Sequence, residues 1–129
     1  MTNTHASVAV VDDEDAVRRA LARLLRAAGF HVESFSSGRQ FLESLPDRRP
    51  DCVILDLHMP DGDGFAVLEQ LAPMTPRLPV VVLTGRDTPE SRERVHQSGV
   101  VGYLRKPVEG TVLVRAIAFA IDPSAGHAT

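Results

Sequence analysis

The sequence predicts an α/β domain with a doubly wound parallel sheet and helices on both of its faces. Short apolar, β-branched runs alternate with helical patterns five times along the 129 residues. Strands that are separated by single helices need right-handed crossovers, which give a parallel sheet covered on both sides. The first run, at residues 7–11, is continuous and apolar, as expected of a strand buried on both faces. A chain of this length fits one domain with its own core.

The first half of the chain supplies two of the expected strand and helix pairs. A strand is expected at residues 7–11. In the helix that follows, apolar residues recur at helical spacing, and Gly29 provides the stop. These residues are Val17, Leu21, Leu24, Leu25 and Ala28. A shorter strand is expected at 32–35, and a helix at 38–45 is closed by Pro46.

The alternation continues in the second half of the chain. Strands are expected at residues 52–56, 80–84 and 103–105, and helices at 65–71, 89–97 and 108–121. Pro89 suits the first turn of its helix, which follows Asp87 or Thr88. Val95 is the only strong apolar anchor of that helix. So small a buried stripe predicts a marginal and mobile helix.

Charged and hydroxyl side chains follow four of the expected strands. They are Asp12 and Asp13 after the first strand, Asp56 after the third, Thr84 at the end of the fourth and Lys106 after the fifth. Ligands of open parallel sheets bind beyond the carboxyl ends of the strands. Lys106 is the only lysine among fourteen basic residues, which indicates a need for a compact point charge in place of a planar guanidinium. The set predicts a phosphoryl-transfer site.

Composition excludes several classes of function. The net charge of −3 argues against a chain that mainly grips nucleic acid or an anionic membrane surface. No apolar run approaches the ~18 residues of a membrane span, and no signal-peptide pattern occurs. Cys52 is the only cysteine, so it cannot form a disulfide framework or a cysteine metal site. We expect a cytoplasmic domain without direct membrane or nucleic-acid contact.

Four short motifs follow the expected strands in a fixed order. They are Val10-Val11-Asp12-Asp13-Glu14, then Asp56-Leu57-His58-Met59-Pro60 with Asp63-Gly64, then Leu83-Thr84-Gly85, and finally Tyr103-Leu104-Arg105-Lys106-Pro107. In this order they resemble the receiver domain of two-component response regulators, the CheY-like group of flavodoxin-like folds. Residues 32–37 with Phe41 and Leu42 further resemble receivers of the FixJ type. The resemblance covers residues 7–121 and implies the strand order 2-1-3-4-5.

The resemblance implies an acceptor and a metal site. Asp56 would accept a phosphoryl group from the phosphohistidine of a sensor histidine kinase or a histidine phosphotransfer protein. Asp12, Asp13 and Asp56 would hold Mg²⁺ (or Mn²⁺), together with the backbone carbonyl of His58. The protein would be a phospho-accepting regulator and not a turnover enzyme.

The resemblance also implies a conformational switch. Lys106 would place its ammonium against the phosphoryl oxygens, and Thr84 would donate its hydroxyl to another of them. Tyr103 would then turn inward into the space that Thr84 vacates, while Pro107 has a structural role. The face formed by the fourth helix, the fifth strand and the fifth helix would be remodelled and would control dimerisation, an output domain or a partner.

The last expected helix is unusually apolar, with one charge in the eleven positions from Thr111 to Ile121. We expect Val114, Ala118 and Ile121 to lie on its outer side. A surface helix that is apolar on both sides is a candidate interface. Phosphorylation-favoured homodimerisation or docking of a partner would use it, and the alternative is a monomer surface that tolerates small alanines.

Other functions that this fold can carry fit the sequence less well than a signalling module does. A flavin carrier would need a phosphate loop where this chain has Asp12-Asp13-Glu14-Asp15, and a haloacid-dehalogenase-like phosphatase would need an aspartate where it has His58. An unphosphorylated interaction module keeps the fold without the chemistry, yet none of the required side chains is missing.

We expect a receiver domain at residues 1–122 and a tail or linker at 123–129. It is either a complete regulator or part of a longer one with a DNA-binding output that regulates transcription.

Overall fold

The protein is described by a computed structural model, which places residues 6–60 and 64–123. Within these residues, five parallel strands form one sheet in the order β2-β1-β3-β4-β5. The strands are β1 (Ser7–Val11), β2 (His31–Phe35), β3 (Cys52–Asp56), β4 (Val80–Thr84) and β5 (Gly102–Arg105). The helices are α1 (Asp15–Ala27), α2 (Gly38–Ser44), α3 (Gly64–Leu71), α4 (Pro89–Gln97) and α5 (Gly110–Ile121). The doubly wound, flavodoxin-like fold and its strand order 2-1-3-4-5 are confirmed.

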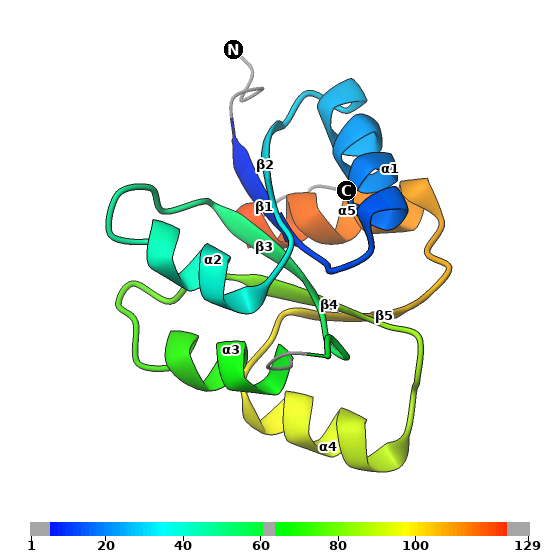
Figure 1. Cartoon of the computed structure of the whole chain (residues 1–129). Coiled ribbons are helices and arrows are strands. Elements are labelled where there is room, and N and C mark those ends of the chain that lie inside the picture. Colours follow the sequence, from blue (N-terminus) through cyan, green and yellow to red (C-terminus); the bar gives the residue numbers. More distant parts are fainter. Residues whose placement is uncertain (1–5, 61–63, 124–129) are drawn as a thin grey trace.

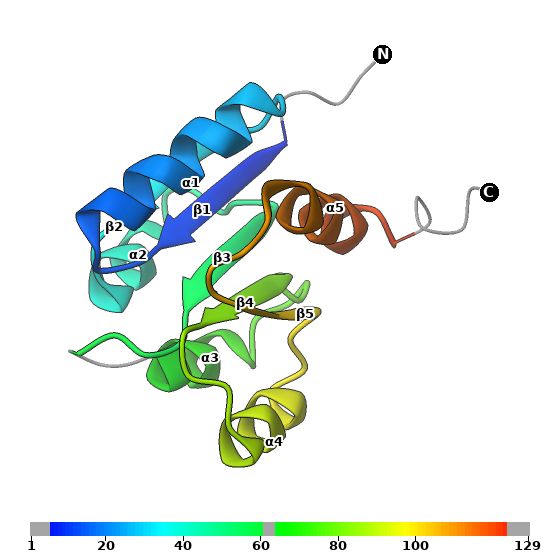
Figure 2. The ribbon, with the colours of Figure 1, turned by 90° about the vertical axis from the view of Figure 1, so that its right-hand side faces the viewer.

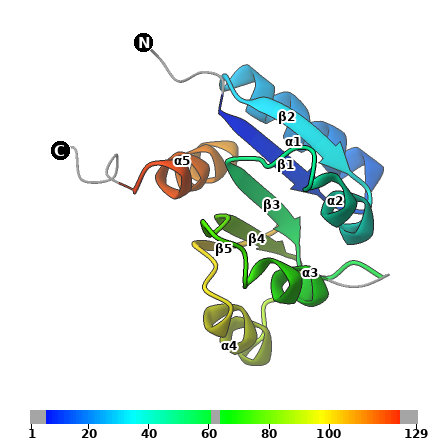
Figure 3. The same ribbon diagram turned by 90° about the vertical axis from the view of Figure 1, so that its left-hand side faces the viewer.

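The helices cover both faces of the sheet (Figure 1). Helices α1 and α5 pack on one face, and α2, α3 and α4 pack on the other, with the central strands between them (Figure 2). Strand β2 lies beside β1 at one edge of the sheet, far from β5 at the opposite edge (Figure 3). The three central strands β1, β3 and β4 are therefore enclosed on both faces.

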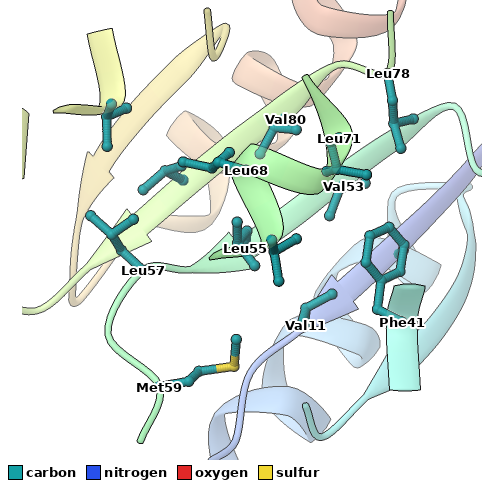
Figure 4. Packing of buried hydrophobic residues seen from close by; sticks show 14 residues of the cluster. Val11, Phe41, Val53, Leu55, Leu57, Met59, Leu68, Leu71, Leu78 and Val80 are labelled. Carbon is teal, nitrogen blue, oxygen red and sulfur yellow. The ribbon is translucent and has the colours of Figure 1, made fainter. Parts of the chain in front are cut away.

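Each central strand contributes to two core layers, because successive residues point to opposite faces. Val8 and Val10 of β1 pack with the α1 and α5 side, whereas Val11 belongs to the layer under α2 and α3. In that second layer the fully buried ring of Phe41 lies beside Val11 (Figure 4). Every residue of β3 and β4 is buried. Polar side chains at the ends of these strands are thus held in a rigid, largely dry setting.

The element boundaries agree closely with the sequence pattern. The five strands and α4 begin and end within one residue of the expected positions. The last helix is shorter than expected, since it begins at Gly110 and not at residue 108, because Glu109 has an extended backbone and serves as the N-cap. Most of the expected tail at 123–129 lies outside the described residues, as does Asp63 of the second motif.

Helix α4 has few apolar anchors, as the sequence indicates. Only Ser91 and Val95 are buried in it, and Thr88 caps its start by accepting a hydrogen bond from the backbone N–H of Ser91 at 3.0 Å. Its predicted mobility stays a prediction. Among residues 6–60 and 64–123, no helix combines the length and apolar character that a membrane crossing requires.

Candidate functional site

Three carboxylates meet where β1 and β3 end. Val11 of β1 is paired with Leu55 of β3, so the next residue of each strand, Asp12 and Asp56, is brought to the same edge. Asp12 is 1% exposed and Asp56 is 5% exposed, whereas Asp13 is open to solvent. One carboxylate oxygen from each of these three aspartates lies within 4.8 Å of the others. The acidic cluster expected from the sequence is therefore assembled.

The carboxylate of Asp12 is fixed by two hydrogen bonds. Its Oδ1 accepts from the backbone N–H of Glu14 at 2.9 Å, and its Oδ2 accepts from Nζ of Lys106 at 3.0 Å. The backbone carbonyl of Asp12 accepts from Nη1 of Arg18 at 2.7 Å, which ties the loop to helix α1. The orientation of this carboxylate is thus set by its own loop, by α1 and by the end of β5.

Lys106 is the counter-charge of the cluster. Its Nζ lies 3.0 Å from an oxygen of Asp12, 3.5 Å from one of Asp56 and 3.8 Å from one of Glu14. Burial by itself lowers the pKa of Lys106, but the hydrogen bond to Asp12 and the nearby carboxylates outweigh it and raise the pKa above its ordinary value. The ammonium therefore stays charged at neutral pH.

The surroundings of Asp56 disfavour a negative charge on its carboxyl group. Burial raises the pKa of this carboxyl group, and the charge of Asp12 adds to that effect, while Lys106 and the backbone N–H of His58 oppose it. A buried carboxylate with a like charge nearby favours a cation or a proton. Hard oxygen ligands of this kind suit Mg²⁺, so the three aspartates could hold such an ion.

Thr84 and Tyr103 are held by adjacent residues of the loop that joins β4 to α4. The Thr84 hydroxyl is buried at the end of β4, donates to the carbonyl of Arg86 at 3.0 Å and accepts from its N–H at 2.9 Å. The Tyr103 hydroxyl donates to Oδ1 of Asp87 at 3.0 Å. Both hydroxyls are thus tied to the loop, an arrangement that the sequence did not reveal.

The backbone around Lys106 is set by its neighbours. The N–H of Lys106 donates to the carbonyl of Thr84 at 2.8 Å. The end of β5 is thereby held against the end of β4. This places the lysine side chain so that it reaches Asp12 across two intervening strands.

Comparison with protein-family models gives a match to the response regulator receiver domain over residues 8–118. The chain belongs to this family. The transcriptional regulatory protein FixJ of Rhizobium meliloti (strain 1021) is 38% identical over 115 residues, which are 88% of this chain and 56% of that protein. The DNA-binding transcriptional regulator NtrC of Escherichia coli (strain K12) is 35% identical over 113 residues, 88% of this chain and 24% of NtrC. The receiver thus spans about half or less of these curated relatives.

Solved structures of receivers have the same fold. A crystal structure of FixJ-N superposes with a TM-score of 0.84 at 34% identity and covers 95% of this chain and 96% of that one. The chemotaxis protein CheY4 of Vibrio cholerae also gives 0.84, at 28% identity, covering 90% of this chain and 98% of that one. The similarity to FixJ in both comparisons identifies this receiver as one of the FixJ type.

The expected outer face of α5 in this receiver needs correction. Ala118 is exposed as expected, but Val114 and Ile121 are half-buried and pack against the core layer under α1 and α5. The large apolar side chains of α5 that face solvent are Val112, 43% exposed, and Phe119, 44% exposed. The buried face of α5 is wider than the spacing of its apolar residues predicts. Val114 and Ile121 therefore lie at the edge of that face and not on the exposed side.

Two sets of residues in the receiver site were missed at the sequence level. Arg18 of α1 contacts the backbone of the acidic loop. The one sequence feature that points to Arg18 is its position three residues after Asp15, a spacing that allows an ion pair within a helix. Asp87 joins Tyr103 to two arginines, Arg92 and Arg105. No local pattern gives that network, since its members come from a loop, a helix and a strand.

Proposed function

We propose that this receiver accepts a phosphoryl group on Asp56 from the phosphohistidine of a sensor histidine kinase or a histidine phosphotransfer protein. The observation that carries the proposal is the position of Asp56, with acidic neighbours within 4.8 Å and the Lys106 ammonium 3.5 Å away. A phosphoryl-transfer site needs such groups, because its chemistry consists mostly of positioning and charge stabilisation. The domain would be regulatory, and it would work in the cytoplasm, where such kinases present their phosphohistidines.

In the proposed step, an oxygen of the Asp56 carboxylate attacks the phosphorus of the phosphohistidine. A new O–P bond forms as the P–N bond breaks, and its electron pair returns to the imidazole nitrogen of the donor, which takes up a proton. The product is an aspartyl phosphate. Ionised Asp56 is the nucleophile, so the groups that oppose its raised pKa, Lys106 first among them, also favour the reactive form.

The acidic cluster would hold the metal ion. Asp12, Asp13 and Asp56 would bind Mg²⁺ (or Mn²⁺) together with the backbone carbonyl of His58. When bound, the ion supplies positive charge that offsets the approach of two anions. The hydrogen bond from Glu14 and the ion pair with Lys106 keep Asp12 oriented for this role.

The remaining side chains would recognise the transferred group and report it. Lys106 would move its ammonium from Asp12 and Asp56 toward a phosphoryl oxygen. Thr84 would exchange its hydrogen bonds with Arg86 for one to another phosphoryl oxygen. Tyr103 would then turn inward, Pro107 would keep the end of β5 in place, and the surface of α4, β5 and α5 would change.

The output would be association or control of a further domain. We propose that two copies associate through the α4, β5 and α5 face, with Phe119 and Val112 as apolar contacts seven residues apart on one side of α5. FixJ and NtrC are named as transcriptional regulators. As the receiver of a longer protein, residues 1–122 would act on transcription through an output domain, joined by a linker that begins at residue 123, without touching DNA themselves.

The test is phosphorylation by a small-molecule donor. The protein is incubated with Mg²⁺ and acetyl phosphate, and its intact mass is followed beside Asp56→Asn, a chelator control and the matched variant Asp47→Asn at an exposed carboxylate remote from the cluster. The proposal predicts a gain of one phosphoryl group by the wild type and by Asp47→Asn. A gain that persists in Asp56→Asn or without metal would disprove it.

A further inference from the structure

The carboxylate of Asp87 joins three elements next to the proposed switch. It accepts two hydrogen bonds from Arg92 of α4, at 2.7 and 2.8 Å, and one from the hydroxyl of Tyr103 on β5, at 3.0 Å. Nε of Arg105, also on β5, lies 3.8 Å away. Asp87 itself belongs to the loop between β4 and α4. A single side chain thus holds the loop, the helix and the edge strand together.

This network differs from an ordinary surface ion pair. The Asp87 side chain is only 11% exposed, although its partner Arg92 is 63% exposed. The bidentate bond with Arg92, together with the Tyr103 hydrogen bond, lowers the pKa of Asp87 to about 2. The carboxylate is therefore fully charged at neutral pH and holds both partners in a defined geometry.

The same loop also binds the other switch hydroxyl. Thr84 exchanges two hydrogen bonds with the backbone of Arg86, the residue directly before Asp87. A Thr84 hydroxyl that turns toward a phosphoryl group on Asp56 must give up these bonds, so the loop backbone must adjust. The adjustment is opposed by the anchors of the next residue, which are Arg92 and Tyr103.

We propose that Asp87 is a latch that keeps Tyr103 and helix α4 in the unphosphorylated arrangement and thereby limits how readily the receiver is phosphorylated. The inference rests on the proposed phosphorylation of Asp56. In a protein with two arrangements, contacts made in only one of them set the population of the other. The hydrogen bond from Tyr103 is such a contact, because the inward position of the ring takes its hydroxyl away from the exposed loop.

A weakly anchored helix makes the latch effective. Only Ser91 and Val95 of α4 are buried, so its position depends on polar contacts to an unusual degree. Arg92 and Asp87 supply one of these, and Arg94, whose guanidinium carbon lies 3.8 Å from the ring centre of Phe65, supplies another. Release of Asp87 would free the start of α4 and leave the contact of Arg94 with α3.

Tyr103 provides a direct readout of the contact. It is the only tyrosine, and the chain has no tryptophan, so ultraviolet emission that is excited at wavelengths where phenylalanine does not absorb comes from this ring alone. A carboxylate that accepts a hydrogen bond from a tyrosine hydroxyl quenches its emission. Asp87→Ala is therefore expected to be brighter than the wild type. The matched control is Glu90→Ala, which removes an exposed carboxylate from the first turn of α4 without touching Tyr103.

The second readout is the rate of phosphorylation by acetyl phosphate with Mg²⁺. The latch predicts that Asp87→Ala and Tyr103→Phe each react faster than the wild type, by about fivefold, and that the double variant is no faster than either single one. Glu90→Ala is expected to react at the wild-type rate. Arg92→Gln, which keeps the carboxylate but removes its strongest partner, should fall between the wild type and Asp87→Ala.

The outcomes separate the latch from a merely structural contact. Emission of Asp87→Ala equal to that of Glu90→Ala would show that the contact is not made in solution and would overturn the proposal. Brighter emission with an unchanged rate would show a structural contact only and would also overturn it. A wild type that takes up no phosphoryl group would instead disprove the proposed function, and the switching role of Asp87 would fall with it.

Discussion

The ammonium of Lys106 lies 3.0 Å from a carboxylate oxygen of Asp12, although the two residues are 94 positions apart in the sequence. They stand at the ends of β5 and β1, which are separated in the sheet by β3 and β4. The long, flexible lysine side chain spans this distance and lies against Asp56 on the way. The pair therefore encloses the proposed acceptor between a cation and an acidic neighbour.

Loss of the Lys106 charge should weaken both the fold and the chemistry. Lys106→Met leaves Asp12, which is 1% exposed, without its charged partner, and we expect a loss of about 1–3 kcal/mol in the free energy of unfolding. Phosphorylation by acetyl phosphate should fall to background. Urea unfolding and intact mass measure the two effects.

Lys106→Arg keeps the charge but places it on a planar group. This variant should be more stable than Lys106→Met but slow in phosphorylation. Phosphorylation of the arginine variant at the wild-type rate would refute the need for a point charge.

Asp56→Asn should be more stable than the wild type at neutral pH without metal. Burial and the charge of Asp12 raise the pKa of Asp56 in the folded state. The folded protein then binds this proton more tightly than the unfolded chain, so stability falls as pH rises from the ordinary carboxyl pKa through the raised value and stays lower above it.

The asparagine variant avoids that cost, and we expect a gain of roughly 1 kcal/mol at pH 7, the size of an ordinary single-residue effect. The gain should vanish at a pH below the ordinary carboxyl pKa, where both proteins are neutral at this position. Urea unfolding at the two pH values measures it. An Asp56→Asn protein that is less stable at pH 7 would show that Lys106 outweighs burial at this site.

Cys52 should be inert in the folded protein. The thiol is completely buried at the start of β3, and burial raises its pKa to about 12. Because the thiolate is the reactive form, we expect no reaction with a disulfide reagent at pH 8 until the protein is unfolded. The raised pKa also predicts that stability is lost as pH rises from the ordinary thiol pKa toward 12. A rapid reaction of the native protein with the reagent would show that the thiol is not buried in solution.

Gly64 should be intolerant of a side chain. A Cβ at this position would lie 2.7 Å from Cα of Leu57 and 2.8 Å from the carbonyl oxygen of Asp56, and neither backbone atom can move aside cheaply. We expect Gly64→Ala to cost about 1–3 kcal/mol through strain behind the acceptor residue. Gly85→Ala is the control, since a Cβ there meets no atom within 4 Å among residues 6–60 and 64–123, its two chain neighbours aside. Equal melting temperatures for the two variants would rule out this packing constraint.

Association of two copies should depend on the exposed side of α5. Phe119→Glu places a charge on the face that Phe119 and Val112 present to solvent, and we expect it to abolish phosphorylation-favoured dimers while leaving phosphorylation intact. Light scattering of phosphorylated protein measures the association. Val114→Glu is a less specific test, because Val114 packs partly against the core and its loss should also reduce stability. Dimers that survive Phe119→Glu would exclude this face.

The sheet could be predicted from the sequence because apolar runs alternate regularly with helical patterns. The acidic cluster could be predicted because its side chains directly follow the strands. Neighbouring parallel strands bring Asp12 and Asp56 together whatever the loops do. The Asp87 network could not be predicted, since it depends on how the loop after Thr84 turns and on where Tyr103 points. The outer side of α5 was predicted only in part, because a helix rich in apolar residues does not reveal by spacing alone how wide its buried stripe is.

Locating the phosphoryl group tests most directly whether Asp56 is the acceptor. After reaction with acetyl phosphate and Mg²⁺, the protein is treated with borohydride, which reduces an aspartyl phosphate to homoserine and releases phosphate. Peptide sequencing by mass spectrometry then finds the altered residue. We expect homoserine at position 56 and nowhere else. Homoserine at position 12 or 13, or a gained phosphoryl group that leaves no homoserine at position 56, would contradict it.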